Sequence, residues 1–262
     1  MTEIATGARR RKAGNALSTL AYPGGLCLVL LALWQFLVPA LDVETSVLPV
    51  PTEILSAGWE NRDLIREHTW PTLLETVVGF AIAAVLGIVV AVAITAVPAI
   101  HKTLYPLLVG SLVVPKIAIA PLFVIWFGFG YTPKIIMVVL IAFFPVVVDM
   151  ALGLTSIPPE LRMLNRSMGA SRWRAFWKIS FPFALPNLFI GLKLAMALAI
   201  IGAIVAEFVQ SSQGLGYLLL QANSTLQTPL FFAAIVALTV LGVVLYMVIE
   251  LLEAVVLRTR RR

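Results

Sequence analysis

Four ionisable side chains stand inside strongly apolar stretches of this sequence, where they could act on a charged solute: Lys116, Asp149, Lys193 and Glu207. An ionisable group at membrane depth usually faces a cavity or a charged partner. We therefore predict a translocation pathway that uses Lys116, Glu207 and Lys193. Lys116 would lower the barrier for a small anion, whereas a cation would favour Glu207. Pairing inside the helix bundle, or snorkelling of Lys193 and Asp149 to the interface, is the alternative that the sequence leaves open.

Residues for catalytic or metal chemistry are sparse. The sequence has two histidines, His68 and His101, and a single cysteine, Cys27. The predicted topology puts the two histidines on opposite sides of the membrane, so they would not share a site. No Gly-x4-Gly-Lys-Ser/Thr motif occurs, so the chain would not supply energy from ATP by itself. We expect neither an enzyme nor a bound cofactor or metal.

A basic and aromatic segment, NRSMGASRWRAFWKISFPFALP at 165–186, interrupts the apolar sequence. Ser156 followed by Pro158–Pro159 predicts a helix start upstream of it. Gly169 then permits a left-handed exit, and Ser171 can cap a second short helix. The pattern indicates two short helices along the membrane surface, joined at a Gly-Ala-Ser corner that another protein's backbone could approach. The alternative is a basic loop that only helps to orient the chain in the membrane.

The composition is that of a membrane protein. Of 262 residues, 60% are hydrophobic and only 12% are charged, and the mean hydropathy is +0.99. A helix needs about 20 apolar residues to cross the hydrocarbon core. Six runs meet this requirement: Leu20–Leu41, Leu73–Val97, Leu104–Phe127, Ile135–Leu154, Ala184–Val209 and Leu230–Leu252. We predict an all-α membrane protein with six transmembrane helices at 20–253, a segment at 1–19 before them and a basic tail at 254–262.

The distribution of positive charge predicts the orientation. With the N-terminus inside, fourteen of the nineteen Lys and Arg residues fall in cytoplasmic segments and three fall outside. Such a bias places both termini, and the loop 155–183, in the cytoplasm. The net charge of +6 is thus attributed to membrane orientation and not to nucleic acid binding. The sequence of the outer loop 42–71 predicts a short amphipathic helix that begins at Thr52. This helix would either only connect two spans or form part of a docking surface for an extracytoplasmic partner.

One loop motif carries a family resemblance. Gly169, followed after nine residues by Ile179, Ser180, Phe181 and Pro182, resembles the Gly-x9-Ile-x-Leu-Pro half of the EAA loop of ABC importer permeases. The stretches LPVPTEIL, PKIAIAPLFVIWFGFG, AEFVQSSQGLGYLLLQA and TPLFFAAI resemble the subgroup that imports nitrate, aliphatic sulfonates and taurine. The resemblance extends over residues 48–253. It departs from the pattern at Met163, Leu164 and Asn165, which replace the Glu-Ala-Ala triplet, and at Phe181, which replaces Leu.

The resemblance implies a type I importer permease in the bacterial inner membrane. Its function would be the pathway for a small anionic solute, of the sulfonate, nitrate or taurine type, delivered by a substrate-binding protein. The permease would form a homodimer with two ATPase subunits, which bind the ATP and Mg²⁺. The same architecture importing a thiamine-precursor pyrimidine or riboflavin is the alternative. A proton-coupled secondary carrier, with Asp149, Glu207 and the lysines as a relay, is a further one.

The resemblance also implies which residues couple the permease to the ATPase. They belong to the loop around the Gly-Ala-Ser corner: Arg162, Arg166, Met168, Gly169, Ala170, Ser171 and Arg172.

Overall fold

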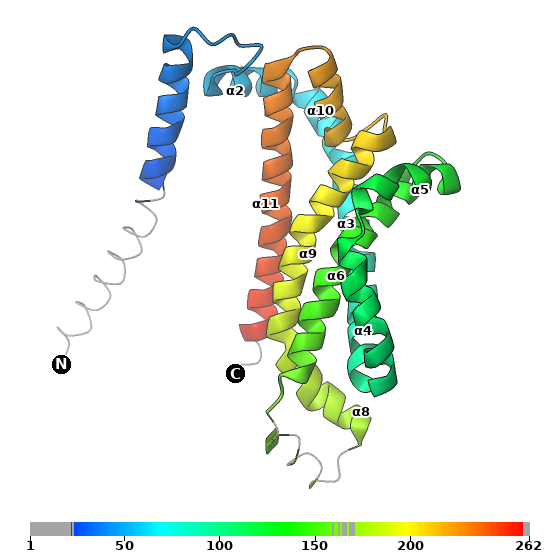
Figure 1. The fold of residues 1–262 in the computed structure, drawn as a ribbon. Helices are drawn as coiled ribbons and strands as arrows, with labels where there is room; N and C mark the ends of the chain where they lie inside the picture. The colour runs from blue at the N-terminus through cyan, green and yellow to red at the C-terminus, as the bar shows by residue number, and fades with distance from the viewer. Residues whose placement is uncertain are drawn as a thin grey trace, which may run out of the picture. The chain divides into compact units, whose positions relative to one another are not determined.

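The computed structural model describes Tyr22 and residues 24–158, 160–161, 163, 167 and 171–258. Every regular element in this part of the chain is helical (Figure 1). The described residues form two compact units. The smaller unit runs to Arg62 and includes Ala222–Ala233, and the larger unit holds 63–221 and the rest of the chain after 233.

The smaller unit joins an apolar helix at Gly24–Ala40 to α2 at Pro51–Glu60. The Glu53 carboxylate accepts a hydrogen bond from the Val50 backbone N–H at 3.1 Å, which satisfies a free donor at the start of α2. The Gln35 side chain bonds both the hydroxyl and the backbone N–H of Thr52, at 3.0 and 3.1 Å. The short helix predicted to open at Thr52 is present and begins one residue earlier, at Pro51.

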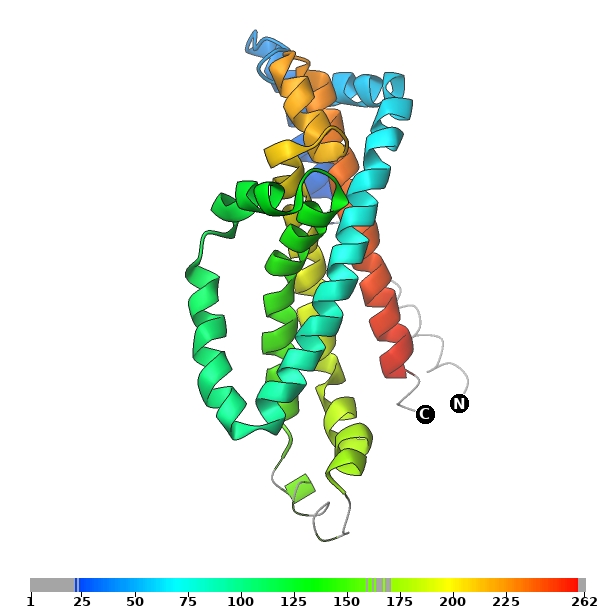
Figure 2. The ribbon, with the colours of Figure 1, turned by 90° about the vertical axis from the view of Figure 1, so that its right-hand side faces the viewer.

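The larger unit holds all or most of each helix that is long and apolar enough to cross a membrane. Four such helices occur in the described residues, and they are α3 at Arg62–Ala96, α6 at Tyr131–Thr155, α9 at Phe181–Gln210 and α11 at Thr228–Arg258. The helix at Gly24–Ala40 is apolar but shorter. In Figure 2, α3, α6 and α9 run side by side along most of their lengths.

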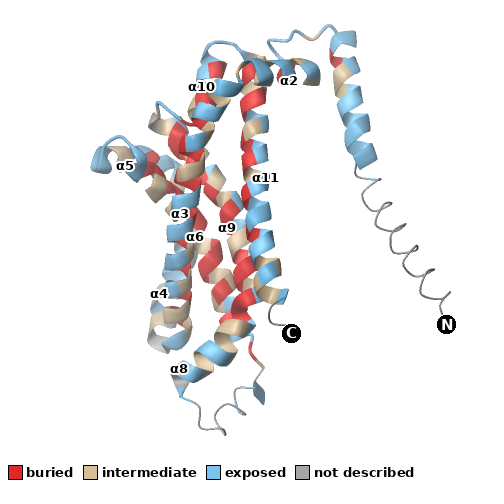
Figure 3. Ribbon diagram, turned by 180° about the vertical axis from the view of Figure 1, so that it is seen from behind, coloured by how far each residue is buried: buried red, intermediate tan, exposed pale blue. Residues whose placement is uncertain are grey.

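The core of this unit lies where α6 packs along α9. Fully buried small and medium side chains recur there every four residues, at Val138, Ala142, Val146 and Met150 of α6 and at Ala195, Ala199 and Ala203 of α9. Figure 3 shows these buried stripes as red segments of the two helices. The spacing places one continuous face of each helix against the other.

Glycines bring neighbouring helices into close contact. A Cβ on Gly79 of α3 would lie 2.5 Å from the Cβ of Val138, and one on Gly87 would lie 2.7 Å from the Cβ of Val146. A Cβ on Gly202 of α9 would lie 3.0 Å from the Cα of Val138. Helices in membranes associate through such close packing because lipid provides no hydrophobic driving force between them.

The predicted span Leu104–Phe127 is not one helix, so that prediction is wrong. The chain forms α4 at Pro98–Val113, a 3₁₀ turn at Lys116–Ile119 and α5 at Ala120–Phe127. Val114 is extended, with φ −65° and ψ 125°, because the following Pro115 disfavours the helical conformation in its predecessor and has no N–H to continue the helix. In Figure 2, α4 and α5 point in clearly different directions.

The basic segment continues directly into a membrane helix. From α8 at Arg172–Ala175, a π-helical turn at Phe176–Ser180 leads into α9, and the helical stretch Trp173–Val209 is 37 residues long. The Ser171 hydroxyl accepts a hydrogen bond from the Arg174 backbone N–H at 3.3 Å, which confirms the predicted cap. A separate second short helix, however, is not formed, because no residue between 172 and 210 ends the helix. The other proposed coupling residues lie outside the described part of the chain: Arg162, Arg166, Met168, Gly169 and Ala170.

Candidate functional site: a buried charged cluster and a polar pocket

Among the described residues of the larger unit, six polar or charged side chains are buried: His68, Thr72, Glu75, Thr76, Lys134 and Glu207. Four of them come from α3, at spacings of four, three and one, which place them on one helical face. The others come from the first turn of α6 and the last turn of α9. Burial of polar and charged groups is costly unless they are paired, so the partners of each group define the site.

The first pair joins α3 to α6. The Lys134 Nζ lies 2.7 Å from the Glu75 Oε1, and the two side chains are 9% and 0% exposed. The Lys134 amino group also lies 5.6 Å from the centre of the Tyr131 ring. The second carboxylate oxygen of Glu75 has no hydrogen-bond partner among the described residues.

The second group ties α9 and the start of α10, at Leu215–Ser224, to α3. The Glu207 carboxylate accepts hydrogen bonds from the Thr72 hydroxyl and the Gly216 backbone N–H, each at 2.6 Å. The Thr72 hydroxyl in turn accepts one from the Leu215 N–H at 2.8 Å. The Gly214 N–H donates to the His68 Nδ1 at 3.1 Å. The turn between α9 and α10 is thus held by His68 and Thr72 of α3 and by Glu207 of α9.

Two glycines are required where this turn covers the Glu207 carboxylate. Gly214 has φ +110°, a conformation that residues with a Cβ rarely adopt. A Cβ at Gly214 would overlap the Glu207 carboxylate, and one at Gly216 would lie 2.7 Å from its Oε2. The Gly-Leu-Gly sequence therefore lets backbone N–H groups reach a buried carboxylate.

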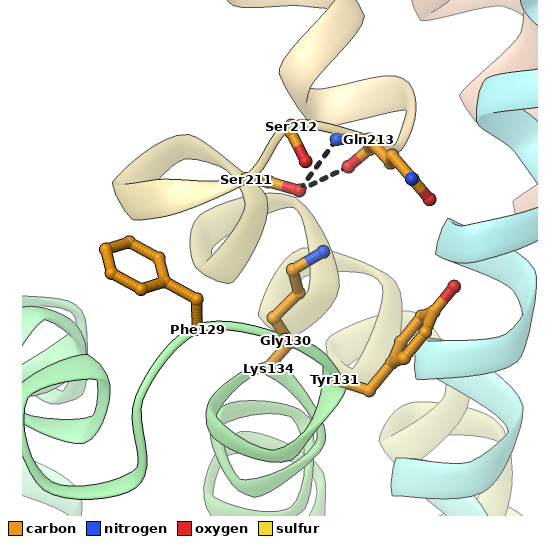
Figure 4. A pocket seen from close by; sticks show the side chains of 7 residues that line it. All are labelled: Phe129, Gly130, Tyr131, Lys134, Ser211, Ser212 and Gln213. Carbon is orange, nitrogen blue, oxygen red and sulfur yellow. Dashed lines mark hydrogen bonds between the residues drawn. The ribbon is translucent and has the colours of Figure 1, made fainter.

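A cavity of about 480 Å³ opens beside the cluster. Its lining comes from the turn before α6, the first turn of α6 and the turn after α9: Phe129, Gly130, Tyr131, Lys134, Ser211, Ser212 and Gln213 (Figure 4). Figure 4 shows the Lys134 amino group pointing toward the turn 211–213, with the Phe129 and Tyr131 rings on either side of it. Lys134 thus belongs both to the buried cluster and to the pocket wall.

A family model matches residues 83–258, and its description is the inner membrane component of binding-protein-dependent transport systems. The chain belongs to this family. It is therefore a permease of the inner membrane, which confirms the family expected from the sequence motifs.

Relatives along most of the chain agree with this assignment. The permease is 37% identical over 222 residues to a probable ABC transporter permease protein of Haemophilus influenzae, covering 85% of this chain and 91% of the relative. It is 34% identical to the riboflavin transport system permease of Chloroflexus aurantiacus, covering 88% and 87%, and 33% identical to the formylaminopyrimidine transport permease of Halalkalibacterium halodurans, covering 90% and 94%. Other relatives are named as permeases for aliphatic sulfonates, taurine and nitrate, at 31%, 27% and 25% identity.

A solved structure shares the fold. A chain of the inward-facing MetNI methionine ABC transporter aligns with a TM-score of 0.64 at 21% identity, covering 74% of this permease and 96% of that chain. The similarity, together with the helical architecture, supports an importer permease fold.

The residues predicted for the pathway occupy three different surroundings. Glu207 lies in the buried cluster. The Lys193 Nζ lies 2.5 Å from the Glu253 Oε2, with both side chains about a fifth exposed, so this lysine pairs α9 with α11. Lys116 begins the 3₁₀ turn, is half-buried and forms no ion pair with the described residues. The structure does not bring these three residues together.

The sequence reasoning missed Glu75 and Lys134. Glu75 lies near the start of the predicted span Leu73–Val97, and Lys134 lies just before the predicted span Ile135–Leu154. The helical spacing of His68, Thr72 and Glu75 could have indicated a polar face on a helix that begins well before Leu73.

The two threonines of the cluster provide a matched test on one helix. Thr72→Val removes the hydroxyl that joins Glu207 to Leu215, and we expect it to lower the free energy of unfolding by about 1–3 kcal/mol. Thr76→Val should have little effect, because the buried Thr76 hydroxyl has no hydrogen-bond partner among the described residues. Thermal unfolding of the two detergent-purified variants checks this. Equal losses would contradict the hydrogen-bond role of Thr72.

Proposed function

We propose that this permease forms the pathway of an ATP-driven importer for a small anionic solute of the sulfonate, nitrate or taurine type. It would act as a homodimer with two ATPase subunits and an extracytoplasmic substrate-binding protein. Family membership supports the importer assignment. The observation that carries the choice of an anion is Lys134, the one charged residue among the described residues that line the polar pocket.

The orientation expected from the charge distribution supports this proposal. With both termini in the cytoplasm, α6 begins and α9 ends at the outer face. The pocket between these helix ends would then open toward the side from which a binding protein delivers its solute. Lys116 is another residue proposed for the pathway. Its ammonium group has no ion-pair partner among the described residues.

A neutral or aromatic solute is the second candidate. The Phe129 and Tyr131 rings line the same pocket, and relatives at 34% and 33% identity are named for riboflavin and formylaminopyrimidine transport. A flat ring system could stack on such side chains. The anion is preferred because a buried ammonium at the wall of a pocket favours a negative charge beside it.

Uptake into proteoliposomes tests the function. The permease is reconstituted with its partner ATPase and binding protein, and labelled taurine, nitrate, riboflavin and formylaminopyrimidine are compared. We expect uptake of an anion that requires both ATP and the binding protein. Uptake driven by a proton gradient without ATP would instead support a secondary carrier, and riboflavin uptake alone would overturn the proposed cargo.

The coupling loop gives a second test of the same proposal. If the Gly-Ala-Ser corner enters a cleft of the ATPase, bulk at Gly169 should do more damage than loss of a rim charge at Arg166. We expect Gly169→Leu to abolish binding-protein-stimulated ATP hydrolysis, since the side chain obstructs close approach. Arg166→Ala should weaken ATPase binding modestly and in a salt-dependent way. Full stimulation in Gly169→Leu would show that the corner is only a connecting loop.

A further inference from the structure

We propose that the pocket formed by residues 129–134 and 211–213 is a binding subsite for the anionic group of the solute, with Lys134 as its direct ligand and Glu75 as the residue that positions Lys134. This inference rests on the proposed import of an anion. It goes further by assigning the subsite, the group that it binds and the two residues that set its specificity.

The pocket has the size and lining of a small-molecule site. Its volume of about 480 Å³ falls within the range of roughly 300–1,000 Å³ for ligand pockets. Ser211, Ser212 and Gln213 offer hydroxyl and amide groups on one side, and the Phe129 and Tyr131 rings offer apolar walls. A small organic sulfonate could therefore place its charged end at the polar side and its carbon chain against the rings.

Lys134 has unused capacity to bind an anion. An ammonium group carries three N–H donors, and among the described residues that of Lys134 forms a single ion pair, with the Glu75 Oε1. The side chain is nine-tenths buried, yet its amino group lines the pocket and points toward the turn 211–213 (Figure 4). A charge in such a partly dry position interacts more strongly with a ligand than a solvated lysine would.

Two features around Lys134 set the strength of binding. α6 begins at Tyr131, its N-cap Gly130 provides no side-chain cap, and the helix start therefore adds positive partial charge to the same wall of the pocket. Glu75 acts in the opposite sense. It holds the amino group in place, but its own negative charge opposes an incoming anion. Affinity for the anion should accordingly rise when Glu75 is neutralised while Lys134 is retained.

Protection of a single cysteine at the pocket rim tests binding without requiring transport. Cys27 is the only cysteine of the chain, so Cys27→Ala followed by Ser212→Cys gives one reactive thiol at an exposed lining position. The intact complex in proteoliposomes is labelled with a membrane-impermeant maleimide. Methanesulfonate is compared with its neutral isostere, dimethyl sulfone, at constant ionic strength. We expect methanesulfonate to slow labelling several-fold and dimethyl sulfone to leave the rate unchanged.

Two variants in this background assign the effect to the charges. Lys134→Met combined with Glu75→Gln removes both charges and leaves neither one buried alone, and we expect it to lose protection completely. Glu75→Gln alone should give half-maximal protection at about a tenfold lower methanesulfonate concentration. Equal protection by the sulfone, or protection that survives in the double variant, would overturn the inference.

The outcome can be separated from that of the proposed function. Protection without ATP-driven anion uptake would leave the subsite standing and refute the proposed import. Anion uptake by the unmodified permease without protection of the cysteine would leave the import standing and refute the subsite.

Discussion

Gly214→Ala should prevent the permease from folding to its native state. The new Cβ would overlap the Glu207 carboxylate, which hydrogen bonds from the Thr72 hydroxyl and the Gly216 backbone N–H hold in place. The φ of +110° adds a strain of about 1–2 kcal/mol for a residue with a Cβ. Moving Glu207 aside would break its bonds to Thr72 and Gly216 and leave a buried carboxylate without donors. We expect a large loss of folded protein in size-exclusion chromatography and a lowered Tm in any remainder.

Gly130→Ala is the matched control for this experiment. Gly130 also has a positive φ, +122°, but a Cβ built there meets no atom within 4 Å. Backbone strain should be the only destabilising effect of this substitution, so the variant should remain folded. A similar loss in the two variants would mean that backbone conformation, and not contact with Glu207, makes Gly214 necessary.

Lys134→Met should have the second large effect. The substitution leaves the fully buried Glu75 carboxylate without its cation. Removing one partner of a buried ion pair costs about 3–5 kcal/mol. We expect a corresponding fall in the free energy of unfolding, measured by thermal or denaturant unfolding in detergent. Adding Glu75→Gln to Lys134→Met should restore most of it, because the side chain at position 75 then carries no buried charge that needs a cation.

Lys193→Met separates the effect of burial from that of losing a lysine. Lys193 also forms an ion pair, with Glu253, but both side chains are about a fifth exposed. The remaining Glu253 carboxylate is less enclosed by protein than that of Glu75, so we expect a smaller loss than for Lys134→Met. If Lys193→Met costs as much as Lys134→Met, the stability of the cluster does not depend on its burial.

Local chemistry was enough to predict several parts of this structure. Runs of apolar residues predicted the membrane helices because hydrocarbon requires every backbone group to be bonded within its own helix. Hydroxyl caps act over three residues, so Ser171 could be identified as a cap from its neighbours alone. The short outer helix and the family of the chain were likewise predicted from continuous stretches of sequence.

The predicted span Leu104–Phe127 shows that the mean hydropathy of a stretch does not reveal a break in its helix. Residues 104–127 are apolar throughout, so their hydropathy predicts one helix. The break at Val114 depends on the single residue Pro115, which ends α4. The number of apolar residues in the span does not indicate where the helix breaks.

The sequence by itself determined that this chain is a helical membrane permease and which of its residues are ionisable within apolar surroundings. Only the tertiary structure decided which charges meet. Lys134 is 59 residues from Glu75, and Thr72 is 135 residues from Glu207. Such pairs form because α3, α6 and α9 pack closely at small residues and because Gly214 and Gly216 admit backbone donors to a buried carboxylate. The energy of a charge depends on its distance to the next charge and on its exposure to water, and both are set by packing between helices.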